Sequence, residues 1–333
     1  MRKILLYILF IFILSYTKAQ NPQFSQFYAI PLFLNPAFTG QTYEHRFAAD
    51  IRDQWPGITT TYKTVAVSYD YNIVSANSGI GFMALQDNSG TPSLSTTLAM
   101  LSYAYHFKIS KFAEIRMGAQ IGYGYKSIDM SKLVLNDQLY YNTPTSFDPY
   151  VTNMNNHIGY LDLNTGALLN SATYWLGFSA QHINKPNTSF SQSEGNNQPV
   201  DISVHGGYKF IREKKGSRYT EYFSPTFNYK HEAKFDQLDI GAYYFKAPLN
   251  FGMWYRGIPL KHYAPGYPNV DAISFLIGVD MDKYDTRIGI SYDITVSRLS
   301  VAKSLGAFEL SIIYEHAKKN KKTKRVLISC PKF

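Results

Sequence analysis

The sequence predicts an all-β protein: a transmembrane antiparallel β-barrel of about 14 strands, of the outer-membrane type. Three observations support this prediction. Apolar and polar residues alternate with period two along most of the chain, as in strands that have one face in lipid. No segment beyond residue 19 contains the run of about 18 apolar residues that a transmembrane helix needs. The connections between the predicted strands are alternately short and long.

The first 19 residues have the features of a signal peptide. A basic pair, Arg2 and Lys3, precedes an apolar run over residues 4–14. Small residues at Thr17 and Ala19 follow, as a signal peptidase requires. The apolar run is too short to cross a bilayer comfortably, which makes a retained membrane anchor the less favoured alternative. We therefore expect residues 1–19 to be removed.

Residues 20–43 form an irregular, aromatic segment ahead of the predicted strands. Two Asn-Pro steps and a glycine disfavour both helix and strand, because proline fixes φ and lacks an N–H donor. The segment nevertheless contains five large aromatic side chains, Phe24, Phe27, Tyr28, Phe33 and Phe38. We expect it to be ordered and to lie at the periplasmic mouth of the barrel or inside its lumen, as a plug or docking element.

Residues 44–317 are predicted to form the barrel. From Val65 to Tyr71, apolar side chains alternate with small or polar ones, so the two faces of the strand differ in character. Segments of this kind, most of them about 9 to 12 residues long, have the length that a tilted transmembrane strand needs. They lie near 44–53, 61–71, 79–87, 94–107, 113–125, 158–168, 173–182, 201–211, 219–230, 236–247, 249–258, 270–281, 284–294 and 307–316.

The lengths of the connections indicate the orientation. If both termini are periplasmic, the connections after even-numbered strands should be short, because outer-membrane barrels have short periplasmic turns and longer external loops. Those at 108–112, 169–172, Pro248 and 282–283 are short, and those at 126–157, 183–200, 259–269 and 295–306 are long. The connection at 231–235 is shorter than expected outside. A soluble β-sandwich is the alternative, but its strands would average about five or six residues.

The sequence contains no arrangement of residues that indicates catalysis, a cofactor or a metal. The histidines are scattered without zinc-site spacing. Asp280, Asp282 and Asp285 lack the glycine and the closing glutamate of a calcium loop, so a solvated hairpin turn is the better interpretation. The single cysteine, Cys330, rules out an internal disulfide. We therefore expect a non-enzymatic protein without a cofactor or metal.

Residues 318–333 form a basic C-terminal tail that contributes much of the formal net charge of +9. We expect no nucleic-acid partner, because the chain is exported. A solvated tail, contact with anionic lipid heads and a periplasmic docking tail are the interpretations left open. The last eight residues, 326–333, are too apolar for a simple solvated tail, which favours packing against another surface.

Both ends of the mature chain resemble one protein family, the PorP/SprF membrane proteins of the type IX secretion system. The resemblance is carried by Phe24, Ser25, Gln26, Phe27 and Tyr28, by Asn35, Pro36, Ala37, Phe38 and Gly40, and by Cys330, Pro331 and Phe333. Internal motifs, such as Arg52 to Trp55 and Gly289 to Asp293, follow in the expected order. The resemblance therefore covers essentially the whole mature chain.

Membership of this family implies an outer-membrane component of the type IX machinery of gliding and related bacteria. It implies a role in secreting or anchoring a large, adhesin-like surface protein through the C-terminal sorting domain of that cargo. The implied partners are the cargo, other type IX components, a periplasmic peptidoglycan-associated protein and outer-membrane lipid. We expect the long connections 126–157, 183–200 and 259–269 to bind the cargo. The alternative is an outer-membrane channel or transporter for small or lipidic solutes.

Overall fold

The computed structural model describes most of the chain between residues 21 and 316. The described ranges are 21–42, 44–58, 62–90, 94–110, 112–144, 146–152, 154–191, 196–215, 218–264, 267–297 and 301–316. The expected signal peptide and the basic tail, with Cys330, Pro331 and Phe333, lie outside them. In the part of the chain that the structure describes, no helix has the length and apolar character needed to cross a membrane.

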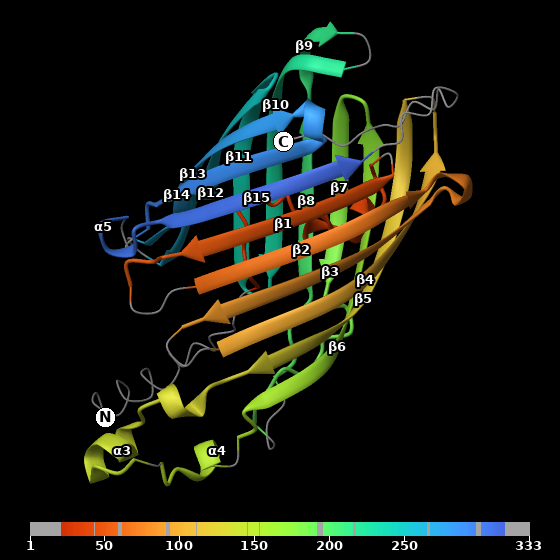
Figure 1. Ribbon diagram of the computed structural model, residues 1–333. Coiled ribbons are helices and arrows are strands. Elements are labelled where there is room, and N and C mark those ends of the chain that lie inside the picture. Colours follow the sequence, from red (N-terminus) through yellow and green to blue (C-terminus); the bar gives the residue numbers. More distant parts are fainter. Residues whose placement is uncertain are drawn as a thin grey trace, which may run out of the picture.

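One antiparallel sheet closes on itself to form a barrel (Figure 1). Its strands are β1 (His45–Gln54), β2 (Tyr62–Ile73), β3 (Ser78–Ser89), β4 (Leu94–Lys108), β5 (Ala113–Ser127), β6 (His157–Ser171), β7 (Tyr174–Gln181), β8 (Asp201–Tyr208), β9 (Phe210–Lys215), β10 (Arg218–Glu232), β11 (Phe235–Lys246), β12 (Leu249–Ala264), β13 (Tyr267–Met281), β14 (Thr286–Thr295) and β15 (Ala307–His316). The sheet closes because β1 pairs with β15 and β10 pairs with β11.

The prediction of a barrel with 14 wall strands is confirmed. Strands β8 and β9 are separated only by Lys209, and both pair with β10, so together they form one strand of the wall. Closure is what the bilayer requires, because an open sheet edge in lipid would leave backbone N–H and C=O groups without partners. All 14 predicted segments correspond to wall strands in the predicted order.

Helical turns are short and lie in the connections and in the N-terminal segment. They are α2 (Pro31–Leu34), η1 (Pro36–Phe38), η2 (Val74–Ala76), η3 (Met130–Lys132), α3 (Asn136–Tyr141), α4 (Pro149–Thr152), η4 (Asp282–Tyr284) and α5 (Val301–Ser304). Three of them, α2, η1 and α4, begin with proline, whose fixed φ suits the first position of a helical turn.

The outward face of the strands is apolar, and the inward face is largely polar, apart from buried apolar residues such as Met83 of β3 and Leu98 of β4. On β2, Val65 and Val67 are exposed on the outer surface, whereas Thr64, Ser68 and Asp70 are buried inside. The same pattern recurs on β4, where Leu101 is exposed and Ser102 is buried. An apolar outer band around a polar interior is typical of outer-membrane barrels. The period-two pattern in the sequence therefore sorts lipid-facing from interior residues.

Long connections gather at one end of the barrel and short turns at the other. The chain segments 128–156, 182–200 and 296–306 follow odd-numbered wall strands, as predicted. The short turns at 109–112, 172–173, 247–248 and 282–285 lie at the opposite end, where β1 begins and β15 ends. By the rule for outer-membrane barrels, the first end is external and the second is periplasmic.

The prediction of a long loop at 259–269 is wrong. Strand β12 continues to Ala264 and β13 begins at Tyr267, so most of this stretch is an extended strand pair. Its pairing is irregular, with register shifts after Arg256 and again around His262. Gly257, with φ at 147°, and the nearby prolines break the alternation from which strands are recognised in a sequence.

Replacing a lipid-facing residue with arginine should destabilise the barrel more when the residue lies near the middle of the bilayer than when it lies near the membrane surface. Leu101→Arg, on the outer face in the middle of β4, should lower the free energy of unfolding by about 2–4 kcal/mol. Gln86→Arg, on the outer face of β3 near the external end, should cost about 0–1 kcal/mol. Urea unfolding of the barrel in lipid vesicles measures both values, and equal costs would contradict the assignment of the outer band.

Candidate functional site

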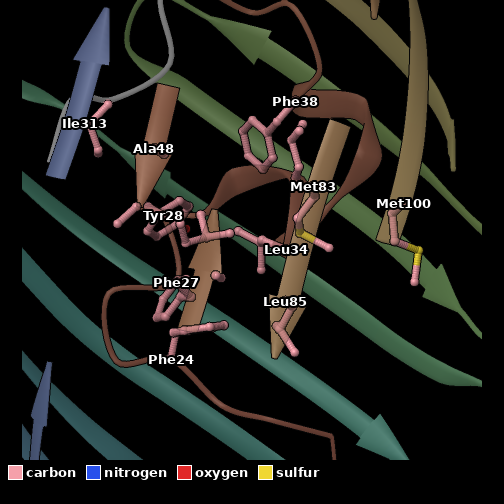
Figure 2. Close-up of a cluster of buried hydrophobic side chains, with 14 of the residues drawn as sticks. Phe24, Phe27, Tyr28, Leu34, Phe38, Ala48, Met83, Leu85, Met100 and Ile313 are labelled. Carbon is pink, nitrogen blue, oxygen red and sulfur yellow. The ribbon is translucent and has the colours of Figure 1, made fainter. Parts of the chain in front are cut away.

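The N-terminal segment lies inside the barrel. Every residue from Phe24 to Gln41 is buried, apart from the half-buried Phe33. Figure 2 shows side chains of this segment packed among wall residues of β1, β3, β4 and β15, including Ala48, Met83 and Ile313. We call residues 21–42 the inserted segment. The aromatic lead-in of the sequence is therefore part of the core of the barrel.

The inserted segment extends from the external half of the lumen to its periplasmic end. At its start, the side-chain amide nitrogen of Asn21 lies 2.9 Å from His182 Nε2, beside the connection that follows β7. At its other end, Gly40 takes up a φ of 66° against Gly79 of β3. A Cβ on Gly40 would lie 2.5 Å from the Cα of Gly79, so this close approach requires glycine.

A buried polar cluster binds the outer part of the inserted segment. We call it the outer clamp; it comprises Ser25, Gln26, Arg52, Arg256, Asp293 and Glu309. The carboxylate of Glu309 accepts the backbone N–H groups of Ser25 and Gln26, at 2.7 and 2.6 Å. Charge-assisted bonds from backbone amides to a carboxylate are stronger than neutral ones. The N–H groups of Ser25 and Gln26 do not take part in strand pairing, and Glu309 supplies the acceptor that they need.

Two arginines complete the outer clamp. The guanidinium of Arg52, 2% exposed as a side chain, donates to Asp293 at 2.7 Å and to Glu309 at 2.9 Å. Arg52 and Arg256 both donate to the hydroxyl of Ser25, at 2.7 and 2.9 Å, and that hydroxyl donates to Asp293. Buried ions are tolerated when each has a partner and further hydrogen bonds. Ser25 thus links the segment to four strands of the wall, β1, β12, β14 and β15.

A second group of contacts, the inner clamp, binds the segment near its periplasmic end. Arg116, which is fully buried, donates to the backbone carbonyls of Ala37 and Thr39, at 3.0 and 2.7 Å. Arg46 donates to a carbonyl in the same turn and pairs with Asp70 at 2.7 Å. Wall side chains therefore take the place that a neighbouring strand would have as a hydrogen-bond partner.

Asn35 ties the middle of the segment to the wall. Its side-chain oxygen, Oδ1, accepts the N–H of Ala37 at 2.8 Å, which caps the turn that begins at Pro36. Its side-chain amide donates to the backbone carbonyls of Ala167 and Phe178, at 3.1 and 3.0 Å. One Asn-Pro step of the sequence motif thus both shapes the segment and joins it to β6 and β7.

Aromatic contacts fill the space between the two clamps. Phe27 packs edge-on against Trp254, with the ring centroids 4.8 Å apart, and Tyr28 lies between Trp254 and Trp175. Phe38 stacks on the buried ring of His205 at 5.6 Å. Such pairs contribute about 0.5–1.5 kcal/mol each beyond the area they bury.

Two cavities between the inserted segment and the wall are very small. One is lined by Phe24, Phe33 and Ser203 and the other by Gln26 and Leu276, and each has a volume of about 10 Å³. A space of that size holds about one water molecule. Within the described ranges, no group of three or more His, Cys, Asp or Glu residues is arranged to bind a metal.

The structure brings together ten of the residues singled out in the sequence. Phe24, Ser25, Gln26, Phe27, Tyr28, Asn35, Pro36, Ala37, Phe38 and Gly40 all lie in the lumen and are buried. Their partners in the two clamps were not predicted. The available signal was a charged side chain at an inward position of an alternating strand, as for Arg52 and Glu309. Such a pattern predicts that a charged side chain faces the interior, but it does not predict which residue pairs with it.

The family model for the type IX secretion system membrane protein PorP/SprF matches residues 16–314. The chain belongs to this family. It is therefore a membrane component of the type IX secretion system, and family membership implies association with other components of that system. No curated protein matches the chain.

Solved structures similar to this PorP/SprF protein are outer-membrane barrels. The CymD monoaromatic hydrocarbon channel is 12% identical over 88% of this chain and 94% of its own, with a TM-score of 0.50. The Pseudomonas putida toluene transporter TodX is 12% identical over 88% and 93%, with a TM-score of 0.44. Omp33 of Acinetobacter baumannii is 7% identical over 84% and 100%, with a TM-score of 0.44. The likeness to CymD shows the fold alone. This barrel fold, together with membership of a secretion-system membrane family, places the chain in the outer membrane.

Removing the carboxylate of the outer clamp should destabilise the protein strongly. Glu309→Ala leaves two buried N–H groups without an acceptor and takes one counter-charge from Arg52, so we expect a loss of about 3–5 kcal/mol. Urea unfolding in detergent micelles measures it. The control is Arg212→Ala, which removes a pair with Glu221 in which the arginine is 70% exposed, and which should cost less than about 1 kcal/mol.

A methyl group on the wall beneath the inserted segment should displace that segment. A Cβ on Gly118 would lie 2.3 Å from the backbone of Pro36 and Ala37, so Gly118→Ala should cost about 1–3 kcal/mol through overpacking. The control is Gly278→Ala, whose Cβ would have no neighbour closer than 3.4 Å. Thermal unfolding followed by circular dichroism distinguishes them, and equal Tm values would argue against tight seating of the segment.

Proposed function

We propose that this PorP/SprF protein holds or delivers a large secreted surface protein at the cell surface by binding the C-terminal sorting domain of that cargo. Family membership supports a role in type IX secretion. The observation that carries the proposal is the filled lumen, since residues 24–41 occupy the interior and are bound by both clamps. The external end of the barrel is then the surface that a folded cargo domain can reach.

The external connections are large enough to form such a surface. The segments 128–156 and 182–200 contribute most of the chain at that end, and a backbone hydrogen bond from Asn155 to Phe190 joins them at 2.9 Å. Joined loops form a more rigid surface than separate ones, which lowers the entropy lost when a partner binds. The short periplasmic turns offer less surface, and contact there with a peptidoglycan-associated protein is a further part of the proposal.

A solute channel is the second candidate. The wall beneath the inserted segment is rich in polar side chains, including Ser102, Gln120 and Asn228, as in barrels that conduct water-soluble molecules. The inner and outer clamps hold the inserted segment in the lumen, which disfavours a permanently open pore. Conductance in planar bilayers separates the candidates, because large steady currents from the intact protein would favour the channel.

Deleting the gene should leave the cargo synthesised but absent from the cell surface. The expected result is normal cargo in whole-cell extracts, with surface labelling reduced to background and restored by the intact gene. A second outer-membrane protein with its own assembly route serves as control for general envelope damage. Unaltered surface display of every cargo that carries a sorting domain would refute the proposal.

A further inference from the structure

The connection between β5 and β6 carries a group of exposed apolar side chains at its tip. Five of them are more exposed than most residues of the lipid-facing wall: Val134 at 68%, Leu139 at 69%, Tyr140 at 82%, Tyr141 at 64% and Phe147 at 66%. We call them the α3 patch, since three belong to helix α3. Figure 1 shows α3 and α4 at the far end of this connection, apart from the strands.

Hydrogen bonds within the connection give the patch a defined shape. The carboxylate of Asp137 accepts the hydroxyl of Ser146 and the N–H of Phe147, at 2.6 and 2.8 Å, which folds the loop back onto α3. The bond from Ser146, with that from Phe147, holds the pKa of the Asp137 carboxyl below its usual range. The rings of Tyr140 and Tyr141 pack edge-on at 4.9 Å. A shaped aromatic surface loses little entropy when a partner covers it.

The bilayer does not account for the α3 patch. On the outer face of β4, Leu101 and Ala99 are followed towards the external end by the polar Thr97 and Ser95. On β5 the last outward-facing aromatic side chain is Tyr125, 42% exposed, two residues before the end of the strand at Ser127. At about 3.3 Å per residue and a tilt of about 40°, the loop begins roughly 5 Å beyond Tyr125, and Figure 1 shows α3 farther out, apart from the strands.

Charge disfavours two other occupants. The connection 128–156 contains three acidic residues, Asp129, Asp137 and Asp148, and one basic residue, Lys132. A second copy docked patch to patch would bring the same acidic loop into contact with itself. An anionic membrane surface would be repelled for the same reason. A separate protein with an apolar pocket and a basic rim fits both the apolar character and the charge.

We propose that the α3 patch is the main surface that contacts the cargo, and that it inserts into an apolar, basic-rimmed pocket on the C-terminal sorting domain. This inference rests on the proposed function. Tyrosine is enriched among the few residues that carry most of the binding energy of an interface. Tyr140 and Tyr141 are therefore the central residues, with Leu139 and Phe147 beside them. The wall and the inserted segment take no direct part in this contact.

The test compares two matched tyrosine variants of the full-length protein. Tyr140→Ala/Tyr141→Ala removes the centre of the patch, and Tyr284→Ala removes a 61% exposed tyrosine of η4 at the opposite end of the barrel. The probe is a fluorescent protein fused to a cargo sorting domain from the same bacterium. We expect the double variant to bind the probe about 30-fold more weakly, a loss typical of interface hot spots, and Tyr284→Ala to bind like the parent.

The outcomes separate this inference from the proposed function. If the double variant binds and displays cargo like the parent while gene deletion abolishes display, the patch assignment is overturned and the proposed function stands. If gene deletion leaves display unaltered, both are overturned. Loss of self-association or of vesicle binding in the double variant, with probe binding unchanged, would assign the patch to a second copy or to lipid and also overturn the inference. An unchanged urea midpoint confirms that the variant barrel is folded.

Discussion

Inside a bilayer no water is available to satisfy a backbone N–H or C=O group, and the architecture of this protein follows from that constraint. The sheet has to close, which it does where β15 meets β1 and where β10 meets β11. Closure creates an interior with a largely polar lining, because the outward face of the strands carries the apolar side chains that meet the lipid. An interior of that kind has to be filled by water or by a segment of the chain.

In this PorP/SprF protein the N-terminal segment fills it. An irregular segment inside a barrel has the same need for backbone partners as a strand in lipid, and here wall side chains supply them. Glu309 accepts two N–H groups, and Arg116 donates to two carbonyls. The charged residues of the interior therefore have a structural role, which accounts for their presence at full burial. Because the lumen is occupied, the proposed function assigns binding of a large partner to the external connections.

Much of the fold could be predicted because its signals are local. In β2, the alternation from Thr64 to Asp70 reports which side chains face lipid, and this depends only on the geometry of a strand. Where the local signal fails, so does the prediction. Gly257 and the prolines near it concealed the outer part of β12 and β13, which continue as an irregular pair. The turn after β11, by contrast, was recognised from Pro248.

By itself the sequence determined the closed antiparallel barrel, its lipid-facing residues, the alternation of short and long connections and the motif that resembles the PorP/SprF family, since period-two alternation and connection length are properties of neighbouring residues. Only the tertiary structure decided where the motif lies and what binds it. Arg52 and Glu309 are 257 positions apart and meet because β1 pairs with β15 in one register. The position of Ser25 between them depends on how the segment packs in the closed barrel. Those long-range contacts arise from closure, and the local pattern of the chain does not encode them.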